Sequence, residues 1–454
     1  MKSLTHSSAE HRGALVLMAV LILSLTVKLT VWAILLPTPD RFENLDSALY
    51  DSSARSLLHL QAFTPSPELP GVAETRRTPG YPLFLAGSYA LFGERYAPVI
   101  FVQVLISVAT IALVYWLARR LWDTRVAALA AVLLLLDIPS FTSSLKIMSD
   151  TLFVFLTTAL LAAGAAVILR DRKTLPAMAV GVLLTVATFV RPVTYYLVVP
   201  LALGVILMAA TKRWRWRTSI VVLLAIVAPY VLGVGVWQVR NGKLTGSSEF
   251  CSLEGFSLLY YRGAPIVALR DGIRLSEARA KLGLERGHAE HYLETGWTPE
   301  LDEAWKREAR ELIFGHPILF LRSQLPGAKL LMLAPGDGDL LRLLGMPVRD
   351  PSDAGRYLER FTTPGTASVS AWAIFYLVVV YSGVLCWVWA RASDRTVTAI
   401  DLFFWVVLLY LAAVSAGQGD SRIRLPMMPL LVMYSALGLS HLWSRFQLRR
   451  GASS

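Results

Sequence analysis

Two acidic residues and a lysine stand beside long apolar segments, where polar side chains could do chemistry at a membrane surface. Asp46 follows the first apolar run, and Tyr50 and Ala54 come at four-residue intervals, so a helix would place all three on one face. Lys146 and Asp150 lie in a short polar segment just before another apolar run. A carboxylate at Asp46 could take a proton from a hydroxyl group. The helix dipole also favours acids at helix N-termini. This explanation stays open for Asp46, and it is the simpler one for Asp150.

Five arginines occupy similar positions at the ends of apolar runs. Arg76 and Arg77 precede a Thr-Pro-Gly-Tyr sequence, Arg191 precedes a proline between two apolar runs, and Arg422 and Arg424 begin the last apolar run. A guanidinium group binds phosphate oxygens with paired donors, so these residues are candidates for anion binding. Contact with lipid headgroups, or arginine side chains reaching to the membrane surface, is the competing explanation.

Carboxylates and arginines on one side of a membrane suit the transfer of a group from a phosphate-bearing lipid. In such a reaction the carboxylate activates an acceptor hydroxyl, and the arginines stabilise the phosphate that leaves. The elements that hold these residues must therefore bring them together at one end of a set of membrane spans.

The composition predicts that these elements are membrane-spanning helices. The chain has 454 residues, of which 55% are hydrophobic and 17% charged, whereas a soluble domain carries about 25% charged residues. Its mean hydropathy is +0.53. Apolar runs such as 218–237 are long and unbroken, which fits helices of about 20 residues and not the short alternating strands of a barrel. We expect an all-α polytopic membrane protein with about 10 to 12 transmembrane helices.

Ten runs are clear candidates for spans, and basic loops orient them. The runs are 14–36, 96–118, 125–138, 150–169, 174–190, 192–210, 218–237, 369–390, 397–415 and 425–443. The formal net charge is +12, and much of it lies in short loops between runs, which is the signal of cytoplasmic loops and does not indicate a nucleic-acid partner. This threading places both termini in the cytoplasm.

The same threading divides the chain into three parts. We expect an N-terminal transmembrane module over 1–237, an outer-face helical region over 238–368 and C-terminal transmembrane helices over 369–454. The outer segments are 37–95, 139–149, 238–368 and 416–424.

Several segments have more specific expectations. Residues 79–93 and 317–335 are apolar but short or interrupted, so we expect interfacial or re-entrant pieces. Segment 298–314 is predicted to be an amphipathic helix with Thr298 as its N-cap. The first run, 14–36, is longer than the core of a cleaved signal peptide, so we expect an uncleaved span.

Metal and disulfide signals are weak. His288 and His291 have a helical spacing without a third ligand, and Asp337 and Asp339 lack a full calcium-loop pattern, so a turn is the simpler explanation. The other candidates are Cys251 and Cys386, which lie in different kinds of segment and are not expected to pair. We predict no metal-ligating residues and no cofactor, and the residues leave open whether a metal is required.

Taken in order, the motifs resemble the GT-C superfamily of membrane glycosyltransferases. The resemblance is to glycosyltransferase family 39, which includes protein O-mannosyltransferases and aminoarabinose lipid A transferases. It is carried by Asp46-x3-Tyr50-x3-Ala54, by Arg77-Thr-Pro-Gly-Tyr81-Pro-Leu-Phe-Leu-Ala, by Ser149-Asp150-Thr-Leu-Phe, by Arg191-Pro192 and by Arg422-Ile-Arg424-Leu-Pro-Met-Met-Pro. Two departures are Ser47, where family members often carry a second acid, and Gly80, which replaces the second of two prolines.

The resemblance implies inverting transfer of a sugar from a polyprenyl-phosphate-linked donor to a lipid, glycan or protein acceptor. Asp46 would then be the general base and Asp150 a second acid that organises the site. The donor phosphate would be held by Arg191, Arg422, Arg424, Arg77 and Lys146, and Tyr50, Arg76 and Tyr81 would contact substrate. The implied location is a bacterial inner membrane, with the site facing the periplasm.

Other functions remain open from the residues alone. A transporter or flippase for lipid-linked glycans would place charges in the middle of spans, whereas the arginines above lie at span ends. An oligosaccharide ligase or polymerase would share the same chemistry, and a structural subunit would not need arginines on the outer face.

Overall fold

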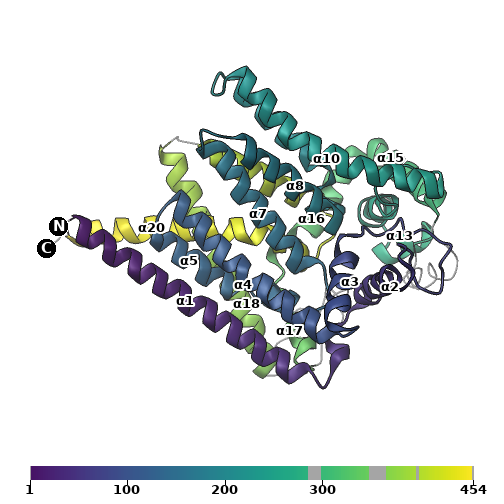
Figure 1. Ribbon diagram of the computed structural model, residues 1–454, viewed down its shortest axis with the longest axis horizontal. Coiled ribbons are helices and arrows are strands. Elements are labelled where there is room, and N and C mark those ends of the chain that lie inside the picture. The colour runs from purple at the N-terminus through teal and green to yellow at the C-terminus, as the bar shows by residue number, and fades with distance from the viewer. Residues whose placement is uncertain (1, 285–297, 347–363, 395–397, 452–454) are drawn as a thin grey trace.

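The chain folds into a bundle of long helices with a cap of short helices at one end (Figure 1). The computed structural model describes residues 2–284, 298–346, 364–394 and 398–451. The protein is 81% helical, and the described residues contain no strand. The all-α membrane fold expected from the sequence is therefore confirmed.

Ten apolar helices of the described part of the chain make up the bundle. Within the described residues, seven helical segments are long and apolar enough to cross a membrane, and three apolar helices are shorter. The long segments lie in α1 (Lys2–Leu35), α4 (Tyr96–Leu121), α7 (Asp150–Leu169), η2 with α9 (Pro192–Leu197 and Val198–Ala210), α10 (Trp216–Thr245), α18 (Pro364–Asp394) and η5 with α20 (Ser421–Met427 and Met428–Gly451). The shorter ones are α5 (Thr124–Leu135), α8 (Thr174–Val190) and α19 (Ala399–Ser415). All ten correspond to predicted runs.

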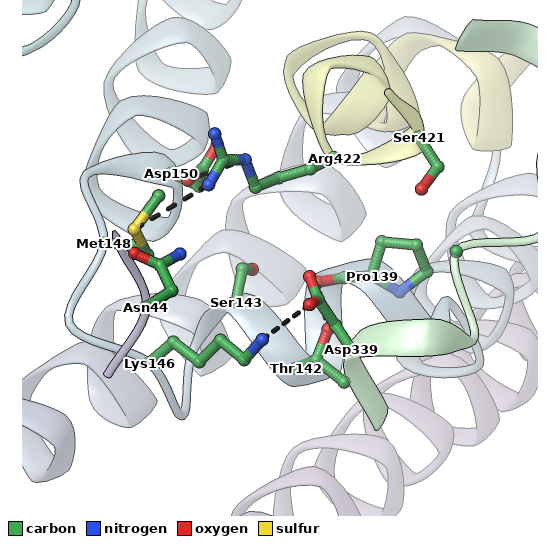
Figure 2. A pocket seen from close by; sticks show the side chains of 11 residues that line it. Asn44, Pro139, Thr142, Ser143, Lys146, Met148, Asp150, Asp339, Ser421 and Arg422 are labelled. Atoms are coloured by element: carbon green, nitrogen blue, oxygen red, sulfur yellow. Dashed lines mark hydrogen bonds and ion pairs between the residues drawn. The ribbon is translucent and has the colours of Figure 1, made fainter. Parts of the chain in front are cut away.

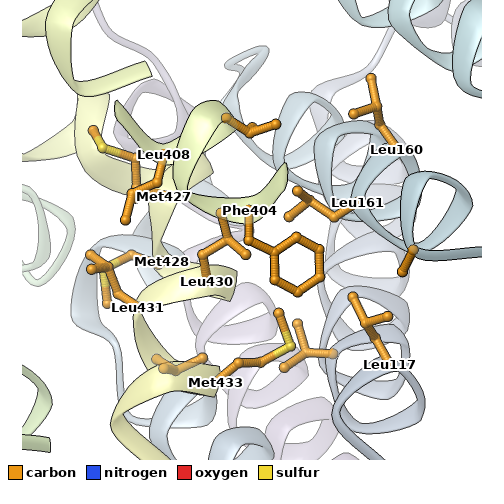
Figure 3. Packing of buried hydrophobic residues seen from close by; sticks show 14 of the residues in the cluster. Leu117, Leu160, Leu161, Phe404, Leu408, Met427, Met428, Leu430, Leu431 and Met433 are labelled. Carbon is orange, nitrogen blue, oxygen red and sulfur yellow. The ribbon is translucent and has the colours of Figure 1, made fainter. Parts of the chain in front are cut away.

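The last span is the central helix of the bundle. In its apolar window 78% of the residues are buried, against 17% for the first span. Gly383 of α18 and Gly438 of α20 have no room for a Cβ atom because each faces the other helix closely, as small residues allow in membrane helices. Figure 3 shows Phe404 of α19 packed among side chains of α4, α7 and α20, including Leu161 and Leu430.

The cap gathers at the end of the bundle opposite to the start of α1 and the end of α20 (Figure 1). Its helices are η1 (Pro39–Phe42), α2 (Leu45–Leu60), α3 (Gly80–Phe92), α6 (Ile138–Ser143), α11 (Glu254–Leu258), η3 (Leu259–Gly263), α12 (Ala264–Asp271), α13 (Leu275–Lys281), α15 (Pro299–Gly315), α16 (Pro317–Leu333) and α17 (Gly338–Leu343). Thr298 caps α15 by accepting a hydrogen bond from the Leu301 N–H, and Trp305 of this helix is buried. The predicted amphipathic helix is thus confirmed.

The two cysteines and the weak metal candidates from the sequence form no disulfide and no metal-binding group within the residues that the structure describes. Cys251 and Cys386 are both free thiols. The described residues contain no group of three or more His, Cys, Asp or Glu side chains placed to hold a metal ion, and His288 and His291 lie outside them.

Candidate active site

Asp46 lies at the start of α2, where local contacts fix its position. The Asn44 side chain caps the helix by accepting from the N–H groups of Asp46 and Ser47, at 2.9 and 3.1 Å. The Ser47 hydroxyl also donates to the Ile147 carbonyl at 2.8 Å. This contact holds the start of α2 against the segment before α7, and the Asp46 side chain stays 37% exposed.

Two arginines from distant parts of the chain converge on the Asp46 carboxylate. Arg77, which lies just before α3, approaches one oxygen at 3.1 Å, and Arg422 of η5 approaches the other at 3.5 Å. Partial burial opposes ionisation of Asp46, but the positive charges of Arg77 and Arg422 outweigh it and hold the pKa below its usual value. Asp46 is therefore an ionised carboxylate at neutral pH.

Asp150 begins α7 and forms the second acidic centre. Its side chain is fully buried and pairs with Arg191, and its other oxygen lies 3.9 Å from Nε of Arg422. Among the described residues neither that oxygen nor the Arg422 Nε has a hydrogen-bond partner. Arg422 thus stands between Asp46 and Asp150 and contacts both, and it keeps a donor for a further group.

Asp150 and Arg422 border a pocket, here called the outer pocket, between η5, α6, α7 and the start of α17 (Figure 2). Its lining consists of Asn44, Pro139, Thr142, Ser143, Lys146, Met148, Asp150, Gly336, Asp339, Ser421 and Arg422. Lys146 is buried and pairs with Asp339 at 2.6 Å. The pocket therefore presents an arginine and a lysine toward the same space, each already near a carboxylate.

The two predicted tyrosines pack next to Arg77 and help to hold it in the site. The Arg77 guanidinium lies over the Tyr50 ring at 4.6 Å, and the Tyr50 and Tyr81 rings meet edge to face at 4.9 Å. Tyr81 is completely buried and donates to Gln103 at 2.8 Å. The Gln103 amide in turn donates to the Lys146 carbonyl. Tyr50 and Tyr81 thus connect Arg77 to the segment that carries Lys146.

Of the predicted site residues, Asp150, Lys146 and Arg422 line the outer pocket, and the others do not. Two of those others, Arg424 and Arg76, have contacts elsewhere. Arg424 is buried and donates to the carbonyls at the end of α16, those of Leu331, Met332 and Ala334, at 3.0, 2.7 and 3.1 Å. It therefore caps a helix C-terminus. The backbone N–H of Arg76 donates to the Glu74 carboxylate, its guanidinium lies 4.0 Å from the same group, and its side chain is not in the lining.

A second pocket, here called the inner pocket, contains a charge that the sequence analysis overlooked. Lys28 lies in the first span, is buried, and donates to the Ser107 hydroxyl. The lining also includes Thr110, Ile111, Leu134, Leu135, Ser140, Phe141, Ser143, Thr151, Val154 and Leu425. Ser143 lines both pockets, so the two adjoin. A lone lysine inside an apolar run was a visible signal for Lys28.

Other site residues lacked any such signal. Asn44, Met148, Asp339 and Ser421 all line the outer pocket. Asp339 was interpreted as part of a turn, and only the fold brings it to Lys146. The assembled site offers an ionised carboxylate with an exposed side, next to cations that can neutralise a phosphate.

Comparison with known proteins agrees with this architecture. The family model for dolichyl-phosphate-mannose-protein mannosyltransferases matches residues 76–237. That match includes Arg77, Asp150 and Arg191, and leaves Asp46 and Arg422 outside. No curated protein matches the sequence.

Solved structures of archaeal oligosaccharyltransferase share the fold at low sequence identity. An oligosaccharyltransferase from Archaeoglobus fulgidus has a TM-score of 0.55 at 13% identity, with 96% of this chain and 52% of that chain covered. The oligosaccharyltransferase AglB from Archaeoglobus fulgidus, in complex with an inhibitory peptide and a dolichol-phosphate, gives 0.54 at 12% identity, covering 96% and 51%. ArnT from Cupriavidus metallidurans gives 0.38 at 15% identity, covering 92% and 76%. The chain spans about half the length of the archaeal structures.

The fold is that of a multi-pass membrane protein and matches the GT-C membrane glycosyltransferase fold. The chain is similar to GT-C membrane glycosyltransferases, as its motifs suggested.

Proposed function

We propose that this chain is an inverting glycosyltransferase that moves a sugar from a polyprenyl-phosphate-linked donor to an acceptor hydroxyl at the outer face of the membrane. The observation that carries the proposal is the position of Arg422, which contacts both Asp46 and Asp150 and borders the outer pocket. A cation between two carboxylates, one of them open to solvent, can hold a phosphate beside a base.

In the proposed step, Asp46 takes the proton of the acceptor hydroxyl. The acceptor oxygen forms a bond to the anomeric carbon as the bond between that carbon and the phosphate oxygen breaks, and the phosphate leaves with the electron pair. Arg422 and Arg77 neutralise the charge that develops on the phosphate. Attack from the face opposite the phosphate inverts the anomeric carbon.

The arginine pairs also link donor binding to the strength of the base. While Arg77 and Arg422 pair with Asp46, its pKa is low and it accepts a proton poorly. A donor phosphate competes for both guanidinium groups, so its binding raises the proton affinity of Asp46. Asp150, which is paired with Arg191, keeps Arg422 within reach of both Asp46 and the donor phosphate.

Similar proteins support the donor class. The matching family is described as using dolichyl-phosphate-mannose, and a solved archaeal relative of the same fold holds a dolichol-phosphate. The start of α1 and the end of α20 lie at the bundle end opposite to the site (Figure 1). With basic loops inside, we therefore place the site on the outer, periplasmic face of a bacterial inner membrane. Lipids, glycans and proteins are all candidate acceptors.

The test is sugar transfer by the full chain in lipid nanodiscs. Undecaprenyl phosphate carrying radiolabelled mannose, or a labelled pentose, is supplied with a bacterial envelope lipid and glycan extract as acceptor. Asp46→Asn keeps the size of the side chain and removes the base, so transfer falls by at least ~100-fold. Asp51→Asn is the matched control, because Asp51 lies on the same helix but pairs with Arg55 and Tyr89.

The outcomes separate the candidate functions. Transfer by wild type and by Asp51→Asn, but not by Asp46→Asn, supports the proposal. Equal transfer by all three proteins contradicts the role of Asp46. A wild type that moves labelled lipid between leaflets without transferring sugar would instead favour a flippase, for which the mid-span charge of Lys28 is the relevant feature.

A further inference from the structure

One short turn of the outer-face region lies beside the site and has had no role so far. Residues Leu259–Gly263 form η3, a single turn of π-helix. Such turns are rare and are often found at functional sites. A Cβ atom at Gly263 would lie 2.8 Å from a Leu259 methyl group, so the turn is closely packed.

This turn is fixed to the segment that carries Arg422. The Arg262 guanidinium donates to the carbonyls of Ala413 and Val414, at 3.3 and 2.8 Å, which lie at the end of α19. A Cβ atom at Gly417, in the loop that leads to η5, would meet the Tyr261 carbonyl oxygen at 2.8 Å. The backbone of Tyr261 therefore has a defined place next to the loop of Arg422.

The two tyrosines of the turn have different surroundings. Tyr260 stacks on Phe256 at 5.0 Å, and the Arg279 guanidinium lies 3.7 Å from the centre of its ring. Tyr261 meets Tyr260 edge to face at 4.9 Å. No hydrogen bond from a described residue to the Tyr261 hydroxyl is present, so this hydroxyl can serve a ligand.

The electrostatic environment connects the Tyr261 phenol with the site. Burial raises its pKa, and the charges of Tyr260 and Asp46 raise it further, whereas Arg279 and Arg422 lower it. The balance keeps the phenol protonated at neutral pH, as a hydrogen-bond donor. The geometry that places Tyr261 beside the site is the approach of its backbone to Gly417, in the loop that leads to Arg422.

We propose that Tyr261 is a substrate-binding residue whose phenolic O–H donates a hydrogen bond to the acceptor and holds its hydroxyl at Asp46. This inference rests on the glycosyltransferase function proposed above. The acceptor is the more suitable ligand because Tyr261 belongs to the outer-face region 238–368, whereas the donor is anchored in the membrane and its phosphate is assigned to Arg422. The side of Asp46 left open by its two arginines is the side that an acceptor must approach.

The experiment compares Tyr261→Phe with Tyr260→Phe in the full chain in nanodiscs. Each variant loses one hydroxyl from the same turn, so a general effect on folding would appear in both melting temperatures. With labelled undecaprenyl-phosphate-mannose as donor and the envelope extract as titrated acceptor, Tyr261→Phe raises the apparent acceptor KM by ~10-fold. The donor KM, and the slow hydrolysis of donor by water without acceptor, stay at wild-type values. Tyr260→Phe leaves the melting temperature, the acceptor KM, the donor KM and the rate of donor hydrolysis unchanged.

Either of two results would overturn the assignment. An acceptor KM for Tyr261→Phe equal to wild type means that the phenol does not bind the acceptor, and a higher donor KM means that it binds the donor instead. Failure of the underlying function is a separate result, because it appears as a wild type without transfer or as an Asp46→Asn variant with full transfer.

Discussion

The outer and inner pockets adjoin at Ser143, yet the charged side chains in the two pockets have different surroundings. Arg422, which lines the outer pocket, lies 3.5 Å from Asp46 and 3.9 Å from Asp150, and the Asp46 side chain is 37% exposed. In the inner pocket the Lys28 ammonium is buried, hydrogen-bonds to Ser107, and has apolar side chains over half of its lining.

The difference shows which charges a ligand can reach. A charge in the membrane interior is tolerated when it is hydrogen-bonded and enclosed, because an exposed one would cost about 2.5–3.5 kcal/mol. Lys28 lies about 10 Å along α1 from its end at Leu35, at 1.5 Å per residue. The Asp46 carboxylate beside the outer pocket is partly exposed, so a phosphate can replace it as the partner of Arg422. We therefore propose that the chemistry takes place beside the outer pocket and that the inner pocket gives structural support.

The largest expected effect separates two arginines that are only two positions apart. Arg422→Met removes the cation between Asp46 and Asp150, so kcat/KM for transfer falls by ~100- to 1,000-fold. Arg424→Met instead leaves three carbonyls at the end of α16 without a donor, and the stability falls by about 3 kcal/mol. Transfer assays and thermal unfolding in detergent measure both quantities for both variants.

We expect each variant to lose a different property, transfer in Arg422→Met and stability in Arg424→Met. Arg422→Met should unfold near the wild-type temperature, and folded Arg424→Met should bind undecaprenyl phosphate as wild type does. Weakened phosphate binding by stable Arg424→Met would place Arg424 in the donor site and remove the distinction drawn between the two residues.

This contrast also marks the limit of what the sequence can predict. Apolar runs and the Thr298 cap are local signals, so the spans and α15 follow from them directly. The Arg422 and Arg424 side chains have the same chemistry and neighbouring positions, and only the 3-10 turn of η5 sends one to the outer pocket and the other to α16. Likewise, the pair of Lys146 and Asp339 joins residues far apart in the chain, and a single sequence contains no trace of it.

The pH profile tests whether the arginines of the outer pocket control its base. Arg77 and Arg422 hold the pKa of Asp46 below the usual value of 3.8. A depressed pKa in the folded state means that the ionised form stabilises the protein above that value and that this stability is lost as the pH falls. In the free enzyme the acid limb of kcat/KM therefore lies below about pH 4. Arg77→Gln removes one cation and moves the limb to higher pH.

The profile is measured as initial transfer rate at low donor concentration, between pH 3 and pH 8 as far as the nanodiscs stay intact, which is about the useful range for carboxylates. Asp51→Asn again serves as the control and should leave the limb where it is. An acid limb near neutral pH in wild type would show that a different group, and not Asp46, is the base.

The smallest expected effect concerns the inner pocket. Lys28→Met keeps a long side chain and removes the ammonium, so the Ser107 hydroxyl loses one partner while a buried charge disappears. These changes oppose each other, because a buried charge replaced by an apolar group of similar volume is often close to neutral for stability. We expect transfer within about 2-fold of wild type and a small change in melting temperature, since among the described residues the hydrogen-bond partner of the lysine is Ser107, which lies outside the Asp46 and Arg422 cluster. A 10-fold or larger fall in transfer with an intact fold would show that the donor reaches past Ser143 into the membrane, and the two pockets would then form one binding site.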